Sequence, residues 1–457
     1  MTGRRLILAS LLGVLLTGCG SVFNLPINRP IDSESPTLDT SLPPKITGDV
    51  AVALSFSGGG TRAAAFAHGV LTALDTMPSR EGGSYLDRVV FISGVSGGSV
   101  AAAYFGLKGR AALGDFRERF LLQNAEESLD TRINLANLVR GIEGGVNDAS
   151  RLPAWLDRQL FHGATLADLH GKNRPMVWIN ASDLFNRTPF HFTPSTFAAL
   201  CSDVTSYPVS QAVAASAAVP VAFAPIVLQT FPDSCRAPLP PWVDRVLKNP
   251  NSGGQARAFA QALIRYRDPG QIRYVKLADG GLVDNFGLAG LVITREIGDR
   301  PYAPLNAERA VRLRRLVFIV VNAGRGPAGN WALSPEGPSG RELLGAVTDT
   351  AIDAAAISSF DAFRLTMNQW ETATRKWRCG LSAAEAKRLG AGPGWRCDDV
   401  RFDLAEVSFD QLGSLTPTLN EVPTRLRLEP EQVELVVNAG IEATRAHPVL
   451  RGSLLGR

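Results

Sequence analysis

The chain has 457 residues and a formal net charge of +4, with 45% hydrophobic residues and 44 glycines. This length suits one large α/β domain or two domains, and the composition is typical of a globular core with many tight turns. The charge is small for the length, and the sequence contains neither a dense basic helix nor a nucleic-acid-binding motif. We therefore expect no nucleic-acid partner.

The N-terminus has the three parts of a secretory signal. Two arginines precede an apolar run over residues 6–16, which is too short to span a bilayer comfortably. The run ends in Leu-Thr-Gly-Cys19, which resembles a bacterial lipoprotein signal. That resemblance implies removal of residues 1–18 and lipid attachment to Cys19, while an ordinary signal peptide is the alternative. The glycine that follows Cys19, in place of an aspartate, favours the outer membrane of a bacterial cell envelope.

Residues 19–48 are polar and proline-rich, and they predict a flexible tether between the lipid and a folded domain. The domain opens with the apolar run Val50–Phe56, a predicted buried strand. A turn with three contiguous glycines, Ser57-Gly58-Gly59-Gly60-Thr61-Arg62, then leads into a predicted helix from Thr61 to Met77.

The spacing of these glycines does not match either common phosphate-binding fingerprint. Contiguous glycines before a helix leave N–H groups that can converge on an oxyanion, so Gly58, Gly59 and Gly60 are candidate donors; a plain connector is the alternative. Arg62 could orient an anionic group or pair with a surface carboxylate.

A second predicted strand, Val89–Ile92, runs into Gly94-Val95-Ser96-Gly97-Gly98 and then into the small-residue run Ser99–Ala103. A serine between glycines at a strand-to-helix turn is the pattern of a nucleophile elbow. Glycines allow the sharp turn, and the following helix directs its N–H groups to where negative charge develops during acyl transfer. Ser96 is therefore the candidate nucleophile.

The remaining pattern alternates strands with helices. Further strands are predicted at Met176–Asn180, Tyr274–Ala278 and Leu316–Val321, with an edge strand at Val400–Phe409; helices are predicted at Ser210–Ala218, Leu343–Trp370 and Glu431–Arg445. Residues 231–271 break the pattern and indicate an insertion or a lid. The alternation predicts an α/β fold with a mostly parallel sheet and helices on both faces.

A serine nucleophile needs a base. Only His447 follows the acidic candidates in the order Ser, Asp, His, but it lies in a polar terminal segment without an evident positioning strand. Asp279 follows a predicted strand and precedes Gly280 and Gly281, at the sheet edge where catalytic groups gather. A carboxylate can act as the base directly if burial raises its pKa.

Four cysteines remain after Cys19, an even number that permits two disulfides in an exported chain. Sequence proximity favours Cys201 with Cys235 and Cys379 with Cys397, although three connectivities or unpaired buried thiols stay open. None of these cysteines has the partner spacing of a zinc site, so no metal is expected.

The glycine turn, the Ser96 elbow, the helix Ala214–Ala218 that ends at a proline, and Asp279-Gly280-Gly281 occur together in the order of the patatin-like phospholipases. The chain resembles that family from Val50 to Leu288. The resemblance implies a three-layer α/β/α fold, a dyad of Ser96 and Asp279, and an oxyanion hole at the three glycines. Ala63, where the family commonly has glycine, is one departure.

We predict a patatin-like catalytic domain over residues 49–325 and a C-terminal helical extension over 326–457 packed on it. The extension and residues 231–271 match no part of the family. The resemblance also implies a cofactor-free hydrolase that cleaves fatty-acyl esters of phospholipids or lysophospholipids at a membrane. An acyltransferase that uses the same acyl-enzyme is one alternative. An envelope interaction protein on a retired hydrolase scaffold is the other.

Overall fold

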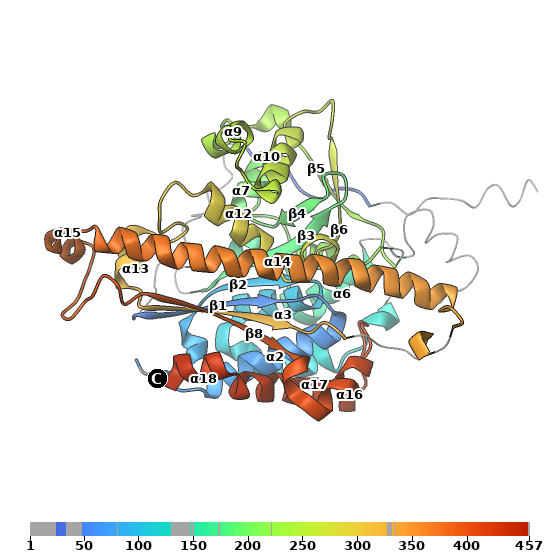
Figure 1. The fold of residues 1–457 in the computed structure, drawn as a ribbon. Coiled ribbons are helices and arrows are strands. Elements are labelled where there is room, and N and C mark those ends of the chain that lie inside the picture. The colour runs from blue at the N-terminus through green and yellow to red at the C-terminus, as the bar shows by residue number, and fades with distance from the viewer. Residues whose placement is uncertain are drawn as a thin grey trace, which may run out of the picture.

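The computed structural model describes residues 24–32, 48–79, 81–128, 147, 150–171, 174–220, 222–326, 331–333 and 335–455. The predicted signal peptide, Cys19 and most of the predicted tether lie outside these residues. One eight-stranded sheet runs through the described chain in the order β5-β6-β3-β2-β1-β7-β8, with β4 paired to β3 (Figure 1). The strands are β1 Val50–Phe56, β2 Val89–Val95, β3 Met176–Asp183, β4 Thr188–His191, β5 Ile226–Gln229, β6 Tyr274–Asp279, β7 Arg315–Asn322 and β8 Arg401–Ser408.

The predicted α/β class with a mostly parallel sheet is confirmed. Strands β3, β2, β1, β7 and β8 pair in parallel, whereas β4 and β6 are antiparallel to β3 and β5 is antiparallel to β6. Because β6 runs antiparallel to β3, it pairs with the carboxyl-terminal part of that strand, with Ala181 opposite Asp279.

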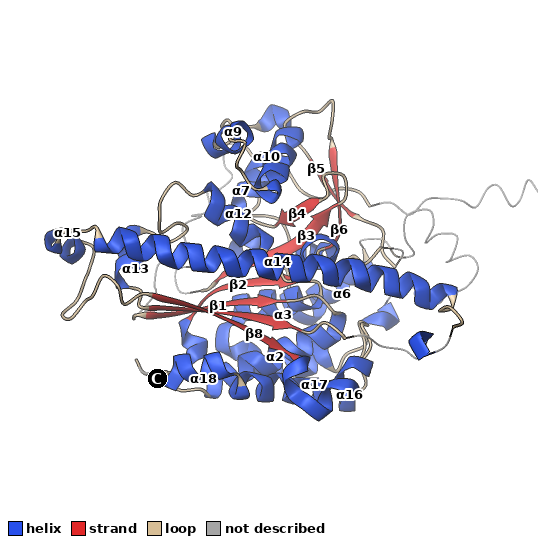
Figure 2. Cartoon of the chain, in the orientation of Figure 1, coloured by secondary structure: helices blue, strands red, loops and turns tan. Residues whose placement is uncertain are grey.

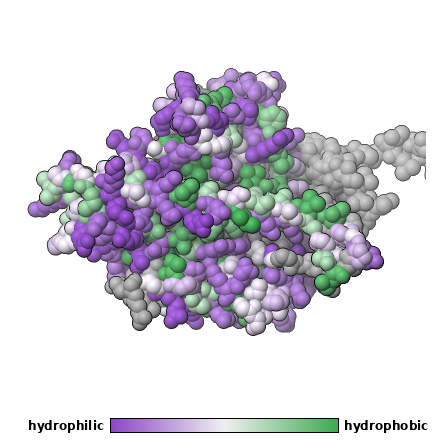
Figure 3. All heavy atoms as spheres, viewed as in Figure 1, coloured by the Kyte–Doolittle hydropathy of each residue, from purple (hydrophilic) through white to green (hydrophobic). Residues whose placement is uncertain are grey.

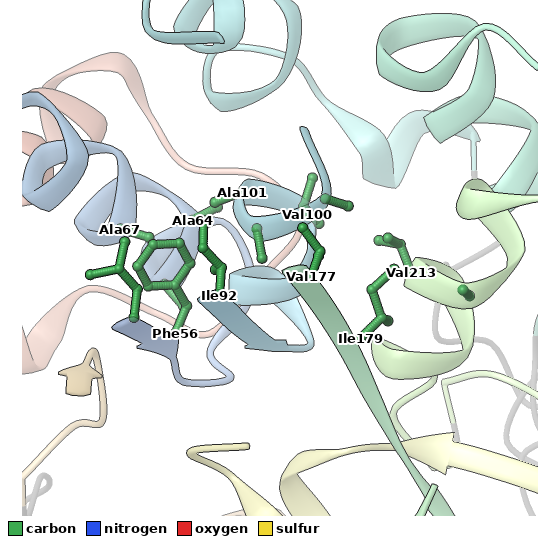
Figure 4. Close-up of a cluster of buried hydrophobic side chains, with 14 of the residues drawn as sticks. Phe56, Ala64, Ala67, Ile92, Val100, Ala101, Val177, Ile179 and Val213 are labelled. Atoms are coloured by element: carbon green, nitrogen blue, oxygen red, sulfur yellow. The ribbon is translucent and has the colours of Figure 1, made fainter. Parts of the chain in front are cut away.

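Helices cover both faces of the sheet (Figure 2). The helices of one face pack with Val52, Leu54 and Phe56 of β1 into the larger of two core clusters. The close-up in Figure 4 shows side chains from β1, β2 and β3 meeting those of the covering helices. These helices are α2 Gly60–Thr76, α3 Gly97–Lys108, α8 Val209–Ser216 and α17 Pro430–Ala446.

The other face of the sheet carries the second core cluster. Ala51 and Ala53, which alternate with the residues above, pack there with Phe363 and Met367 of the long helix α14. The elements after β6 on this side are α11 Gly281–Asp284, α12 Ala289–Ile297, α13 Ala307–Arg312 and α14 Gly340–Cys379. Figure 1 shows α14 lying across the whole sheet.

Shorter helices complete the described chain. They are α4 Ala112–Phe116, α6 Arg151–Leu156, α7 Pro194–Leu200, α9 Pro241–Lys248, α10 Gly254–Tyr266, α15 Ala383–Arg388, α16 Thr416–Glu421 and α18 Pro448–Leu455. None of the described helices is both long enough and apolar enough to cross a membrane.

The C-terminal region is part of the same folded unit as the predicted catalytic domain. Strand β8 extends the sheet by pairing with β7 over its full length. Helix α17 packs closely on α2, and a Cβ atom added at Gly69 would lie 2.2 Å from the Val437 carbonyl oxygen. The edge strand predicted at Val400–Phe409 is thus present as β8. The described C-terminal residues also contribute a layer to the core.

Residues 231–271, predicted as an insertion or a lid, pack as part of the domain. Helix α10 buries Phe259, Ala260 and Tyr266, and the Tyr266 hydroxyl donates a hydrogen bond of 2.7 Å to Asp183. The disulfide Cys201–Cys235 ties the start of this segment to the end of α7. The segment is therefore packed against the rest of the domain, and its role as an insertion or a lid stays a prediction.

The second disulfide joins Cys379, the last residue of α14, to Cys397. Both disulfides are the pairs that sequence proximity favours.

Candidate active site

The predicted nucleophile lies at a sharp turn between β2 and α3. Ser96 has φ 51° and ψ −123°, a backbone conformation that is costly for a residue with a side chain. The close approach requires glycines on both sides: a Cβ atom at Gly94 would lie 2.6 Å from Ser99 Cα, and one at Gly98 would lie 2.5 Å from the Ser57 carbonyl oxygen. The sequence folds into an elbow here because the neighbouring residues leave room for it.

Asp279, the predicted base, ends β6 and is buried. Its Oδ1 accepts a hydrogen bond of 2.8 Å from the Gly281 N–H, and the Ser96 side chain lies near enough to influence its pKa. Burial raises the pKa of Asp279 to about 6, although the Gly281 N–H and the Ser96 side chain partly oppose the rise. The structure therefore brings the two predicted residues together and makes the carboxylate more basic than usual.

Ser216, the last residue of α8, holds both members of this pair. Its hydroxyl accepts a hydrogen bond of 2.8 Å from the Ser96 N–H and donates one of 2.6 Å to the Asn180 carbonyl. Its carbonyl accepts the Gly280 N–H at 3.1 Å, and the Ala218 carbonyl accepts the Asp279 N–H at 2.8 Å. The end of α8 thus fixes the main chain at the nucleophile and at the carboxylate.

The glycine turn after β1 reaches the elbow directly. A Cβ atom at Gly97 would lie only 1.9 Å from the Gly60 carbonyl oxygen, so the starts of α2 and α3 touch. Gly59 and Gly60 have φ values of 138° and 61°, which glycine adopts without strain. Among the described residues, no acceptor is found for the Gly59 and Gly60 N–H groups, which precede the first turn of α2.

Gly58 differs from the other two predicted donors. Its N–H donates to both the carbonyl oxygen and Oδ1 of Asn285, each at 3.1 Å. A Cβ atom at Gly58 would lie 2.5 Å from the same Oδ1. Gly58 therefore anchors the turn to the segment after Asp279, and its N–H is already engaged, in contrast to our prediction of a free oxyanion donor.

Arg62 is buried under the glycine turn. Its guanidinium donates to the carbonyls of Ala323, at 3.0 Å, and Val422, at 2.7 Å. Burial and the neighbouring Arg325 lower the pKa of Arg62 to about 9, while Asp349 acts in the opposite direction. This placement favours a role in orienting the turn over contact with a substrate head group or pairing with a surface carboxylate.

The histidine alternative finds no support at this site. His447 is buried between α17 and α18. Burial lowers its pKa, and a hydrogen bond with the Glu406 backbone only partly opposes this effect. No histidine is among the groups that act on Asp279, within the part of the chain that the structure describes. The described residues also contain no group of three or more side chains able to hold a metal ion.

Sequence reasoning missed Ser216, Asn180 and Asn285. Ser216 was visible inside the small-residue helix Ala214–Ala218, where no role could be assigned to it because its partners lie on other strands. Asn285 lies six residues after Asp279. Its closeness to the predicted base made it easier to find from the sequence than Ser216.

A strained serine at a strand-to-helix turn, with a buried carboxylate as its partner, is the arrangement of an acyl-transferring serine hydrolase. Residues 54–292 match the patatin-like phospholipase family. Because the match covers more than half of the chain, the chain belongs to that family of lipid acyl hydrolases.

Two solved structures are similar to this chain in fold. Human GIVD cytosolic phospholipase A2 has 12% identity and a TM-score of 0.41 over 89% of this chain, which spans 63% of the human protein. VipD from Legionella pneumophila has 14% identity and a TM-score of 0.33 over 98% of this chain and 72% of its own. At these scores neither structure adds to the functional argument. A sequence comparison with curated proteins gave no match.

Proposed function

We propose that the protein hydrolyses fatty-acyl esters of phospholipids or lysophospholipids with Ser96 as nucleophile and Asp279 as base. The observation that supports this most is the buried Asp279, whose pKa is raised to about 6 and responds to the side chain of Ser96, a serine in a strained turn. At neutral pH such a carboxylate is ionised and still more basic than one in water, so it can accept the serine proton.

In the first half of the reaction, Asp279 takes the Ser96 proton as Oγ attacks the acyl carbonyl. The N–H groups of Gly59 and Gly60 stabilise the negative oxygen that forms. The tetrahedral intermediate expels the alcohol, which leaves with the proton from Asp279, and the acyl group remains on Ser96. Water then gives its proton to Asp279 and attacks the ester, and Ser96 recovers a proton as the fatty acid is released.

We also propose that Cys19 carries a lipid that anchors the protein to the outer membrane of a bacterial envelope. The lipoprotein-like sequence before Cys19 supports this, and several acyl chains at about 0.8 kcal/mol per buried methylene would anchor the protein firmly. Metabolic labelling with an alkyne fatty acid tests it: the native chain should take up label and Cys19→Ser should not.

The test of the reaction compares wild type with Ser96→Ala, Asp279→Asn and His447→Ala on a soluble short-chain ester. We expect the first two variants to lose at least about a hundredfold in kcat and His447→Ala to keep its activity. Labelling by a fluorophosphonate probe should require Ser96. Activity that survives Ser96→Ala, or that disappears in a folded His447→Ala, would contradict the dyad. Product analysis with an added alcohol distinguishes hydrolysis from acyl transfer.

A further inference from the structure

Residues 24–32 are fixed on the folded domain, although they were predicted to belong to a free tether. The buried Asn24 donates from Nδ2 to the carbonyls of Ala224, at 3.1 Å, and Pro225, at 2.7 Å. The buried Asn28 exchanges hydrogen bonds of 2.9 Å with the main chain of Gln229 in β5, and the Ile31 N–H donates to the Cys201 carbonyl. In Figure 1 this blue segment runs beside β5.

The attachment point of this segment is next to the proposed active site. Pro225 immediately precedes Ile226, which pairs with Leu277, two residues before Asp279. The loop that reaches Pro225 starts at Ala218, whose carbonyl holds the Asp279 N–H. Asn24 is therefore bound to the residues that lead directly into β5, which pairs with β6, the strand that ends at Asp279.

Two apolar side chains of the segment point away from the domain. Leu25 is 74% exposed and Ile27 is 47% exposed, whereas Asn24 and Asn28 on either side are buried. Val219, in the loop between Ala218 and Pro225, is 44% exposed. We call the surface formed by Leu25 and Ile27 the N-terminal rim.

The length of chain between Cys19 and the rim fixes where a membrane would lie. Only five peptide steps separate Cys19 from Asn24. Fully extended, they reach about 17 Å, and the polar layer on each side of a bilayer is roughly 5–8 Å thick. A lipid on Cys19 therefore holds Asn24, and with it the β5–β6 edge that carries Asp279, close to the surface that carries the lipid.

We propose that the N-terminal rim docks on the membrane that anchors Cys19, so that the enzyme hydrolyses lipids of its own leaflet. The occupant of this surface is a phospholipid layer, into whose interface Leu25 and Ile27 insert. Because Asn24 is bound to the domain, a lipid on Cys19 would also orient the domain relative to the membrane. The inference rests on the proposed lipidation of Cys19 and on the proposed hydrolysis.

The outward face of α14 offers a matched comparison. Val347 is 58% exposed and Ile357 is 64% exposed, outside the stripe of buried residues that includes Ala356 and Phe363, and hydrophobic residues are visible over α14 in Figure 3. This face has the same apolar character as the rim, but no short connection to an anchor.

The first experiment measures hydrolysis in the same membrane and between membranes. Full-length lipidated protein is reconstituted into vesicles of phosphatidylethanolamine and phosphatidylglycerol, with a fluorogenic phospholipid in those vesicles or in a second population. We expect hydrolysis at least about tenfold faster in the same vesicles, because anchoring raises the effective substrate concentration. Equal rates in the two arrangements would overturn the inference.

Variants then locate the contact. Leu25→Ser/Ile27→Ser, and separately Asn24→Ala, should lower same-vesicle hydrolysis about five- to tenfold and leave hydrolysis of a soluble short-chain ester unchanged. Val347→Ser/Ile357→Ser is the control and should change neither rate. A loss in the α14 variant with none in the rim variant would overturn the rim assignment. Absence of soluble-ester hydrolysis in the unmodified protein would instead contradict the proposed function.

A second measurement is independent of catalysis. A polarity-sensitive fluorophore is attached to Leu25→Cys or to Ile357→Cys in full-length protein whose native cysteines are paired or lipidated. On reconstitution, we expect a blue shift and quenching by lipid-borne quenchers at position 25 and no change at position 357. No shift at position 25, or a larger one at position 357, would refute docking through the rim.

Discussion

Replacing Asp279 by asparagine should remove the base and at the same time stabilise the fold at neutral pH. The pKa of Asp279 is raised from 3.8 to about 6 because the carboxylate is buried. Asparagine keeps an oxygen that can accept the Gly281 N–H but carries no charge. The variant therefore removes the free-energy cost of the buried charge and keeps the local packing and the hydrogen bond from Gly281.

The magnitude follows from linkage between protonation and folding. A carboxyl group whose pKa is higher in the folded state favours folding at low pH, and that contribution is lost as pH rises from about 4 to about 6. A rise of roughly two pKa units corresponds to about 3 kcal/mol of destabilisation at pH 7.5 and about 1 kcal/mol at pH 4.5. We expect the stability advantage of Asp279→Asn over wild type to grow by about 2 kcal/mol between these two pH values.

Urea titrations of both proteins at pH 4.5 and pH 7.5 measure this difference, with Ser96→Ala as a control that keeps the buried carboxylate. The wild-type kcat on a soluble ester should rise with pH through about 6, as Asp279 ionises. A stability difference that is independent of pH, together with a kcat that does not change between pH 5 and pH 7.5, would refute a basic, buried Asp279.

Three further substitutions test the groups around the pair. Ser216→Ala removes the acceptor of the Ser96 N–H and should lower kcat about tenfold with little change in KM. Steady-state kinetics measures both constants, and a change in KM with an unchanged kcat would argue against a positioning role. Arg62→Met leaves two buried carbonyls without their donor and should lower the free energy of unfolding by about 2–3 kcal/mol, measured by denaturation. Gly69→Ala drives a Cβ atom against the Val437 carbonyl and should cost about 1–3 kcal/mol, whereas Gly114→Ala, where nothing lies within 4 Å, should not destabilise.

The strands of the central sheet were predictable where burial is continuous. Val50–Phe56 and Leu316–Val321 are apolar runs because both faces of those strands are covered by helices, and β1 has the predicted bounds. Strand β5 was missed because it has four residues at the sheet edge and alternates between buried and partly buried positions. The hydrophobic pattern therefore predicts the central strands of the sheet well and the short edge strand β5 poorly.

The site divides in the same way between local and long-range information. The elbow at Ser96 and the turn at Gly59 and Gly60 are local features, because glycines at fixed offsets are needed for the backbone to turn. The engagement of Gly58 by Asn285 joins residues 227 positions apart, and no spacing rule announces it. Burial of Asp279, which raises its pKa, likewise depends on how β6 and the end of α8 pack.

The glycine turn depends on contacts with the C-terminal region that its own sequence motif does not include. The match to the family ends at residue 292, yet the Arg425 carbonyl accepts the Thr61 N–H at 2.8 Å and would lie 2.4 Å from a Cβ atom at Gly60. Val422 in the same loop accepts a hydrogen bond from Arg62. The glycine turn is thus held by the loop that follows α16, more than 350 residues further along the chain. Because these are main-chain carbonyls, almost any sequence could supply them, and only the fold of the C-terminal region places them beneath the turn.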